Sequence, residues 1–237
     1  MANVNFPTAV SQKVQGIWYD DYATTDEGGF FVASNPTVGT GITGTICVDD
    51  AATGSSTHAQ FAPFVLLYNT QVVTNPNAYS IYPRYMKFMI LTAPASATLW
   101  RYSFRMDSVN RWASGGSLIV PINPNPASSR SSIAQLNVGA IVPTALPSAS
   151  ARLVAAGYID SAIPVIGDQY LLRFGNSSMA MDQLNGGTVA KNMCYNVPPV
   201  IIPPGWGLAF DWWGTSNAAT AIVAEFEMGW VERVPGL

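Results

Sequence analysis

Charged residues are scarce in this chain of 237 residues. They make up 11% of the sequence, while hydrophobic residues make up 49%, whereas about 25% of an average soluble domain is charged. A monomer of this composition must cover its surface with small polar and apolar groups, which favours association with a partner. The net charge of −3 argues against a nucleic-acid partner, because such proteins carry basic patches that neutralise phosphates.

Histidine and cysteine are also nearly missing. His58 is the only histidine and lies in a polar loop, which argues against Ser-His-Asp, Cys-His and multi-histidine metal sites. Cys47 and Cys194 stand far apart and form no metal-binding spacing, which favours two buried free thiols. The short motifs of the common hydrolase, metalloprotease and nucleotide-binding classes do not occur. We therefore predict a protein that is not an enzyme, with no cofactor and no metal.

No apolar run is suited to a membrane. The uncharged interval 192–210 approaches the length of a spanning helix, but it contains four prolines, each of which lacks a backbone donor that lipid cannot replace. The first residues, MANVNFPTAVSQKV, have neither the basic region nor the apolar run of a secretory signal. We expect no membrane partner, and synthesis in a cytoplasm.

Short apolar stretches bounded by proline, glycine, asparagine and serine fill the sequence instead, which is typical of a β protein. Segments 84–92 and 99–106 predict a hairpin in which Trp100, Tyr102, Phe104 and Met106 share one face. The other face is expected to be basic, and Lys87 can share it with Arg101 and Arg105 if the register of the two strands allows.

Three further segments indicate how the sheets are built. PPVIIPPGWGLAFDWWGT (198–215) predicts a strand, a proline corner and a second strand. Segment 221–233 alternates apolar and polar residues, as expected of a long strand inside a sheet, and would add a third antiparallel strand. Segment 151–159 is read as a strand in preference to a helix. The fold class is therefore predicted as all-β: a single jelly-roll-like antiparallel β-sandwich over residues 27–237, preceded by an N-terminal arm, 1–26.

Charge is distributed unevenly along the chain. Residues 1–60 hold one lysine and six acidic residues, whereas residues 84–130 hold six basic residues and one aspartate. The two groups either intermingle within one monomer, which we favour, or dock acidic on basic between copies. Two chemical readings of the acidic loops are open but weaker than a solvated loop: a glycosidase pair among residues 20–27, and calcium either at Asp49 and Asp50 or in the loop DDYATTDE, 20–27.

Aromatic side chains divide into two predicted groups. Trp100, Trp206, Trp212 and Trp230 stand at strand spacing and are expected in the core. Arginines outnumber lysines eight to three, a choice that suits desolvated protein contacts. The candidate interface residues are Phe6, Trp18, Tyr19, Arg101, Arg105, Trp112 and Trp213.

The segments VIIPPGWGLAF, GGFFVASNPTVGTGI and ARLVAAGYID resemble those of tailed-bacteriophage virion proteins of jelly-roll type, particularly capsid cement or decoration proteins. The resemblance covers about half of the chain in scattered pieces, and its motifs are architectural. It implies a structural protein on the capsid surface of a virion, which forms a homotrimer or homodimer and binds a viral major capsid protein. It implies no catalytic, cofactor-binding or metal-binding residue. The alternative is a phage spike head that binds a receptor or a carbohydrate.

Overall fold

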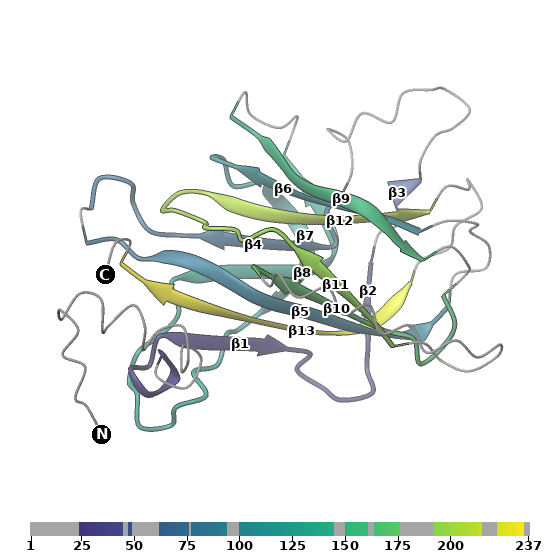
Figure 1. Ribbon diagram of the computed structural model, residues 1–237, viewed down its shortest axis with the longest axis horizontal. Helices are drawn as coiled ribbons and strands as arrows, with labels where there is room; N and C mark the ends of the chain where they lie inside the picture. The colour runs from purple at the N-terminus through teal and green to yellow at the C-terminus, as the bar shows by residue number, and fades with distance from the viewer. Residues whose placement is uncertain are drawn as a thin grey trace, which may run out of the picture.

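Two β-sheets packed face to face form the protein, which confirms the predicted all-β sandwich (Figure 1). The computed structural model describes residues 24–44, 47–48, 62–75, 77–93, 100–144, 150–160, 164–175, 192–214 and 222–234. Sheet A has the order β1 (Phe30–Ser34), β13 (Val223–Arg233), β5 (Ser80–Thr92), β10 (Gln169–Phe174) and β11 (Asn192–Val197), with β2 (Ile42–Thr43) also on β13. Sheet B has the order β7 (Trp112–Ile119), β8 (Ala134–Pro143), β4 (Val65–Asn69), β12 (Gly207–Gly214), β6 (Trp100–Asp107) and β9 (Arg152–Asp160), with β3 (Cys47–Val48) also on β12.

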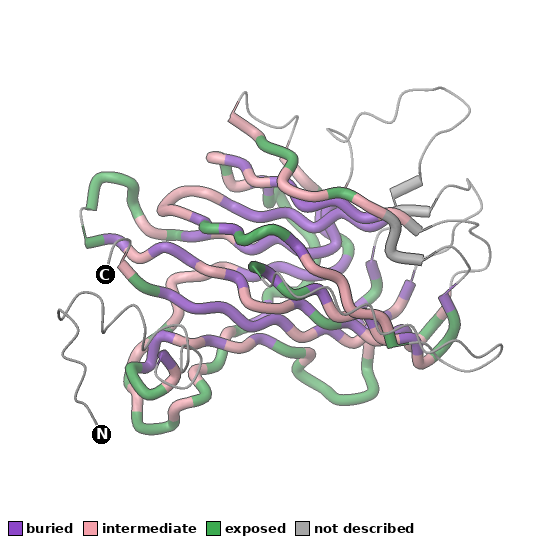
Figure 2. The backbone as a smooth tube through the Cα atoms, viewed as in Figure 1, coloured by how far each residue is buried: buried purple, intermediate pink, exposed green. Residues whose placement is uncertain are grey.

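Aromatic rings fill the space between the two sheets. Phe88 of sheet A lies 4.6 Å from Trp212 and 5.8 Å from Phe210 of sheet B, measured between ring centroids. Phe210 in turn contacts Phe104 at 5.0 Å. Rings at these tilted geometries attract one another beyond the area that they bury. Buried residues accordingly recur along the strands of both sheets (Figure 2).

The C-terminal strand β13 pairs with β5 on one side and with β1 and β2 on the other, as predicted for a strand inside a sheet. Its predicted inward residues are all buried: Ile222, Ala224, Phe226, Met228 and Trp230. The pairing slips between Gly229 and Trp230, where β5 contributes Pro83. A bulge at this point accommodates a proline, which has no N–H to give to the ladder.

The predicted hairpin of segments 84–92 and 99–106 is wrong. Strand β5 pairs with β13 and β10 in sheet A, whereas β6 pairs with β12 and β9 in sheet B. The connection between them therefore crosses from one sheet to the other. Alternation along a strand shows which of its faces is apolar, but it carries no information about which strand lies alongside.

The proline corner also joins two sheets. Ile202 forms a single bridge to Ile81 of β5 in place of the predicted strand, and the turn ends at Gly205, whose φ of 75° suits glycine. Strand β12 then begins in sheet B. Because β12 and β13 lie in different sheets, the predicted run of three successive antiparallel strands is wrong. Segment 151–159 forms the predicted strand, β9.

Replacing Phe210 with alanine tests the aromatic core. Phe210 is buried and contacts rings from both sheets, so F210A should lower the free energy of unfolding by about 3–5 kcal/mol. Urea titration followed by tryptophan fluorescence measures this. The control V38A alters a side chain that is 93% exposed and should change stability by less than about 0.5 kcal/mol. Equal stability of the two variants would contradict the described core.

Candidate functional site

A charged cluster lies on the outer face of sheet B, the face turned away from sheet A. Both oxygens of the Asp211 carboxylate accept hydrogen bonds from Arg105, from Nε and Nη2 at 2.9 Å each, and one also accepts from the Ser103 hydroxyl at 3.0 Å. Asp211 has no exposed surface, and Arg105 is 7% exposed. The two side chains come from the adjacent strands β12 and β6, and their bidentate geometry is the strongest that a guanidinium and a carboxylate adopt.

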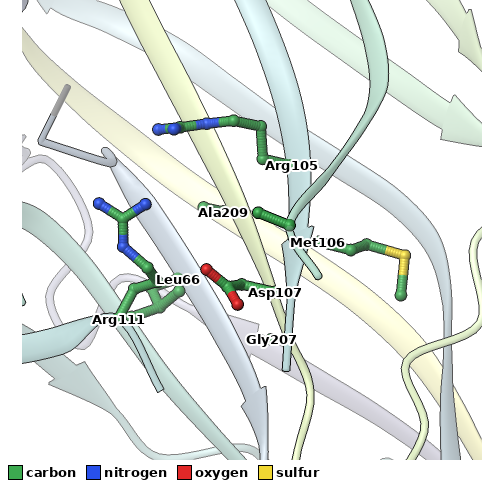
Figure 3. Close-up of a pocket in the computed structure, with 8 residues that line it drawn as sticks. Leu66, Arg105, Met106, Asp107, Arg111, Gly207 and Ala209 are labelled. Carbon is green, nitrogen blue, oxygen red and sulfur yellow. The ribbon is translucent and has the colours of Figure 1, made fainter. Parts of the chain in front are cut away.

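Two more charges lie next to this pair. Arg111, in the turn between β6 and β7, is 4% exposed, and Asp107, at the end of β6, is 5% exposed. Arg105, Asp107 and Arg111 all line one pocket (Figure 3). These residues surround a cavity of about 10 Å³ whose floor includes Leu66 and Ala209, which is room for one water-sized atom.

The electrostatic surroundings of Arg111 are unfavourable to its charge. Burial lowers the pKa of Arg111, and repulsion from the charge of Arg105 lowers it further, whereas Asp211 and Asp107 act in the opposite direction. The lowering contributions prevail because burial is the largest of these effects on the pKa of Arg111. Arg111 is therefore a cation held in an environment that does not fully compensate it.

A second buried carboxylate holds one end of the sandwich together. Glu232 of β13 is 1% exposed and accepts hydrogen bonds from the Ser132 hydroxyl, from the Ile133 backbone N–H at 3.1 Å and from Trp230 Nε1 at 3.0 Å. Arg130 donates to the Glu232 backbone carbonyl at 3.0 Å and lies over the Tyr79 ring at 4.2 Å. Glu232 thus joins the loop before β8 to sheet A.

Burial raises the pKa of Glu232 above its usual value, and the bonds from Ser132, Trp230 and Ile133, together with the charge of Arg130, reduce that increase without cancelling it. The protonated form is therefore favoured in the folded protein relative to the unfolded chain. These hydrogen bonds explain why the Glu232 carboxylate lies in the interior. They indicate a structural role for Glu232.

Strand β7 forms an exposed edge of sheet B. All of its residues except Ile119 are exposed, and it pairs only with β8 among the described strands. Apolar side chains are exposed along this strand and directly after it: Leu118, Val120 and Ile122. Segment 112–122 contains no charged residue. Edge strands of soluble proteins usually carry charge or are covered, because a bare edge recruits another chain.

The outer face of sheet A carries a shallow groove of about 240 Å³ beside Lys87, Glu225 and Glu227. Both carboxylates are already in use, since Glu227 accepts a hydrogen bond from the Tyr85 hydroxyl at 2.7 Å and Glu225 accepts one from the Gly39 N–H.

Within the described part of the chain, no three His, Cys, Asp or Glu side chains gather closely enough to hold a metal ion. No helix among the described residues is long and apolar enough to cross a membrane.

The predicted basic face does not form as expected. Arg105 is buried against Asp211, Arg101 is half-buried on β6, and Lys87 lies on the other sheet. The expectation that Arg105 projects from an exposed basic face is therefore wrong. The sequence signal that was overlooked is Asp211, the one acid in an apolar strand, which faces the arginine-bearing side of β6. The sequence likewise shows that Arg111 is basic, but it does not show that this side chain is buried.

Other predicted residues have mixed outcomes. Trp212 and Trp230 are buried and Trp206 packs against the core, as predicted. Trp112 opens the exposed edge β7 and donates from Nε1 to the Gly115 carbonyl at 2.9 Å. Cys194 is a free thiol but only half-buried. The remaining predictions lie outside the described residues, or on side chains outside them: Phe6, Trp18, Tyr19, Asp20, Asp21, Cys47, Asp49, Asp50, His58, Trp100 and Trp213.

Comparison of the chain with protein-family models, with curated proteins and with solved structures found no match.

Replacing Asp211 with asparagine tests the buried ion pair. D211N leaves the Arg105 charge uncompensated in the interior, so it should lower the free energy of unfolding by about 3–5 kcal/mol. S103A removes a single hydrogen bond to the same carboxylate and should cost about 1 kcal/mol. Urea titration at pH 7 measures the loss of unfolding free energy in each variant and so distinguishes the two effects. A D211N protein as stable as wild type would show that the pair is not formed in solution.

The raised pKa of Glu232 predicts a pH dependence of stability. The folded state holds this proton more tightly than the unfolded chain, so the contribution is full below the unfolded pKa and is lost as pH rises through the folded pKa. E232Q has no proton to lose. Urea titrations between pH 4 and pH 7 should therefore show that E232Q gains stability relative to wild type as pH rises. E27Q, which neutralises an exposed carboxylate, should show no such trend, and a flat difference for E232Q would refute the assignment.

Proposed function

We propose that this protein is a non-enzymatic structural protein of a virion, which associates with its own copies and docks on a viral shell to stabilise it. The observation that carries the proposal is the edge strand β7, which pairs only with β8 among the described strands, is exposed along nearly its whole length and has no charged residue. The resemblance to capsid cement and decoration proteins supplies the viral context.

A second copy of this chain is the occupant that fits β7 best. Identical charged surfaces repel when they meet, and segment 112–122 has no charge that would oppose such a contact. The edge of β7 that pairs with no described strand can offer backbone groups to another strand, as in strand addition, although the Gly115 carbonyl already accepts from Trp112. Leu118 and Val120 beside this edge, 63% and 73% exposed, would lose contact with water on pairing.

Association in this manner suits attachment to a lattice. Each copy in an oligomer needs only a modest interface with the shell, because simultaneous engagement raises the effective affinity by roughly 10²- to 10⁴-fold. The low overall charge reduces the desolvation cost of such contacts.

A charge placed on the β7 edge tests this proposal. L118E should convert an oligomer at micromolar concentration into a monomer, measured by light scattering after size-exclusion chromatography, and should abolish co-sedimentation with viral particles. Leu153 on β9, the opposite edge of sheet B, is 57% exposed and provides the matched control L153E, which should remain oligomeric. A monomeric wild-type protein that is missing from purified particles would overturn the proposal.

A further inference from the structure

The backbone groups of Leu118 point away from β8, toward the edge of β7 that pairs with no described strand. In an antiparallel ladder, successive residues direct their N–H and C=O groups alternately to one side of the strand and to the other. Thr70, directly after β4, donates from its N–H to the Ile133 carbonyl on the β8 side, whereas the backbone of Asn69 bonds segment 205–206, before β12. When this alternation is followed through the paired residues of β4, β8 and β7, Asn137 bonds β4 and its opposite residue Leu118 faces the outer edge.

Ile122 gives independent evidence that this edge accepts a strand. It stands four residues beyond Leu118, an even number, so its backbone groups point to the same side. Its N–H donates to the Val32 carbonyl at 2.7 Å, and its carbonyl accepts from the Val32 N–H at 2.9 Å. Strand β1 therefore occupies the edge at Ile122, while Leu118 pairs with no described strand on that side.

Two features limit the part of the edge that another strand can use. On one side of Leu118, the Gly115 carbonyl already accepts from Trp112 Nε1 at 2.9 Å. On the other side, Pro121 has no N–H to donate. The usable stretch is therefore 116–120, and Leu118 lies at its centre.

The side chains and the space beside this stretch are suited to pairing. Ile119 is 4% exposed and belongs to the core, so the pleat directs Leu118 and Val120 to the outer face of sheet B, where both are exposed. A cleft of about 440 Å³ borders the stretch at Gly116 and Ser117, which leaves room next to the strand.

We propose that two copies of this chain pair antiparallel through their β7 strands, about a two-fold axis at Leu118. This inference rests on the self-association proposed above and adds its symmetry and register. In an interface between identical surfaces, contacts are reciprocal, so the central Leu118 lies opposite the same residue of the second copy. Opposite residues of this kind exchange both N–H···O bonds. The two copies of sheet B become one continuous sheet, and the assembled unit is a homodimer rather than a homotrimer.

A cysteine at position 118 tests the register. With both natural cysteines replaced by serine, L118C should form an intermolecular disulfide under mild oxidation, because the two Cα atoms of such a pair are about 5.5 Å apart. V120C changes a side chain on the same face but should not cross-link, since it lies four residues from its own copy along the strands, roughly 13 Å. Non-reducing electrophoresis measures both. Equal cross-linking of the two variants, or a dimer in which L118C does not cross-link, would overturn the register.

Proline at position 118 tests the orientation of the backbone. Proline is tolerated on a strand edge where its nitrogen faces outward, so L118P should remain folded but become monomeric at a concentration at which the wild type is a dimer. S117P removes an N–H that faces β8 and should be strongly destabilised. Urea titration and light scattering measure the two properties. An L118P protein that stays dimeric, or that is as destabilised as S117P, would overturn the proposed pairing.

The wild-type mass separates this inference from the one on which it rests. A trimer that L118E dissociates would overturn the two-fold pairing and leave the proposed self-association standing. A monomeric wild-type protein would overturn both.

Discussion

Packing of aromatic rings between the sheets, centred on Phe88, Phe210 and Trp212, is the constraint on which the rest of the structure depends. Once these rings face inward, the pleat of each strand directs every intervening residue outward. Arg105 and Asp211 are therefore on the outer face of sheet B because Phe104 and Phe210 are in the core. The polar cluster is a geometric consequence of where the apolar side chains must lie.

The middle of the outer face of sheet B is itself buried, which explains why its charges occur as a group. Leu66, Ala209 and Asn137 on this face are buried together with Arg105 and Asp211. A single charge in such a place would be strongly unfavourable, whereas a bidentate pair with a further hydrogen bond is tolerated. Arg111 and Asp107 extend the cluster.

Buried charges also deepen the shortage of charge on the surface. The chain has only 25 Lys, Arg, Asp and Glu residues in all, and six of the described ones are almost completely buried: Arg105, Asp107, Arg111, Asp168, Asp211 and Glu232. The surface that meets water or another molecule is therefore poorer in charge than the composition indicates. A surface so poor in charge supports the proposed self-association more strongly than the amino-acid composition does. Strand β7, which has no charged residue, is the strongest candidate for the contact.

The sequence by itself determined the secondary-structure class, the inward faces of β6, β12 and β13, and the place of Trp212 and Trp230 in the core, because alternating apolar residues have one physical outcome in a strand. It did not determine which strands pair. Segments 84–92 and 99–106 are adjacent in sequence yet lie in different sheets, since the length and twist of the whole sandwich decide pairing. The candidate site was missed for the same reason. Asp211 and Arg105 are 106 residues apart, and only the alignment of β12 beside β6 brings their charges together and makes a surface arginine into a buried one.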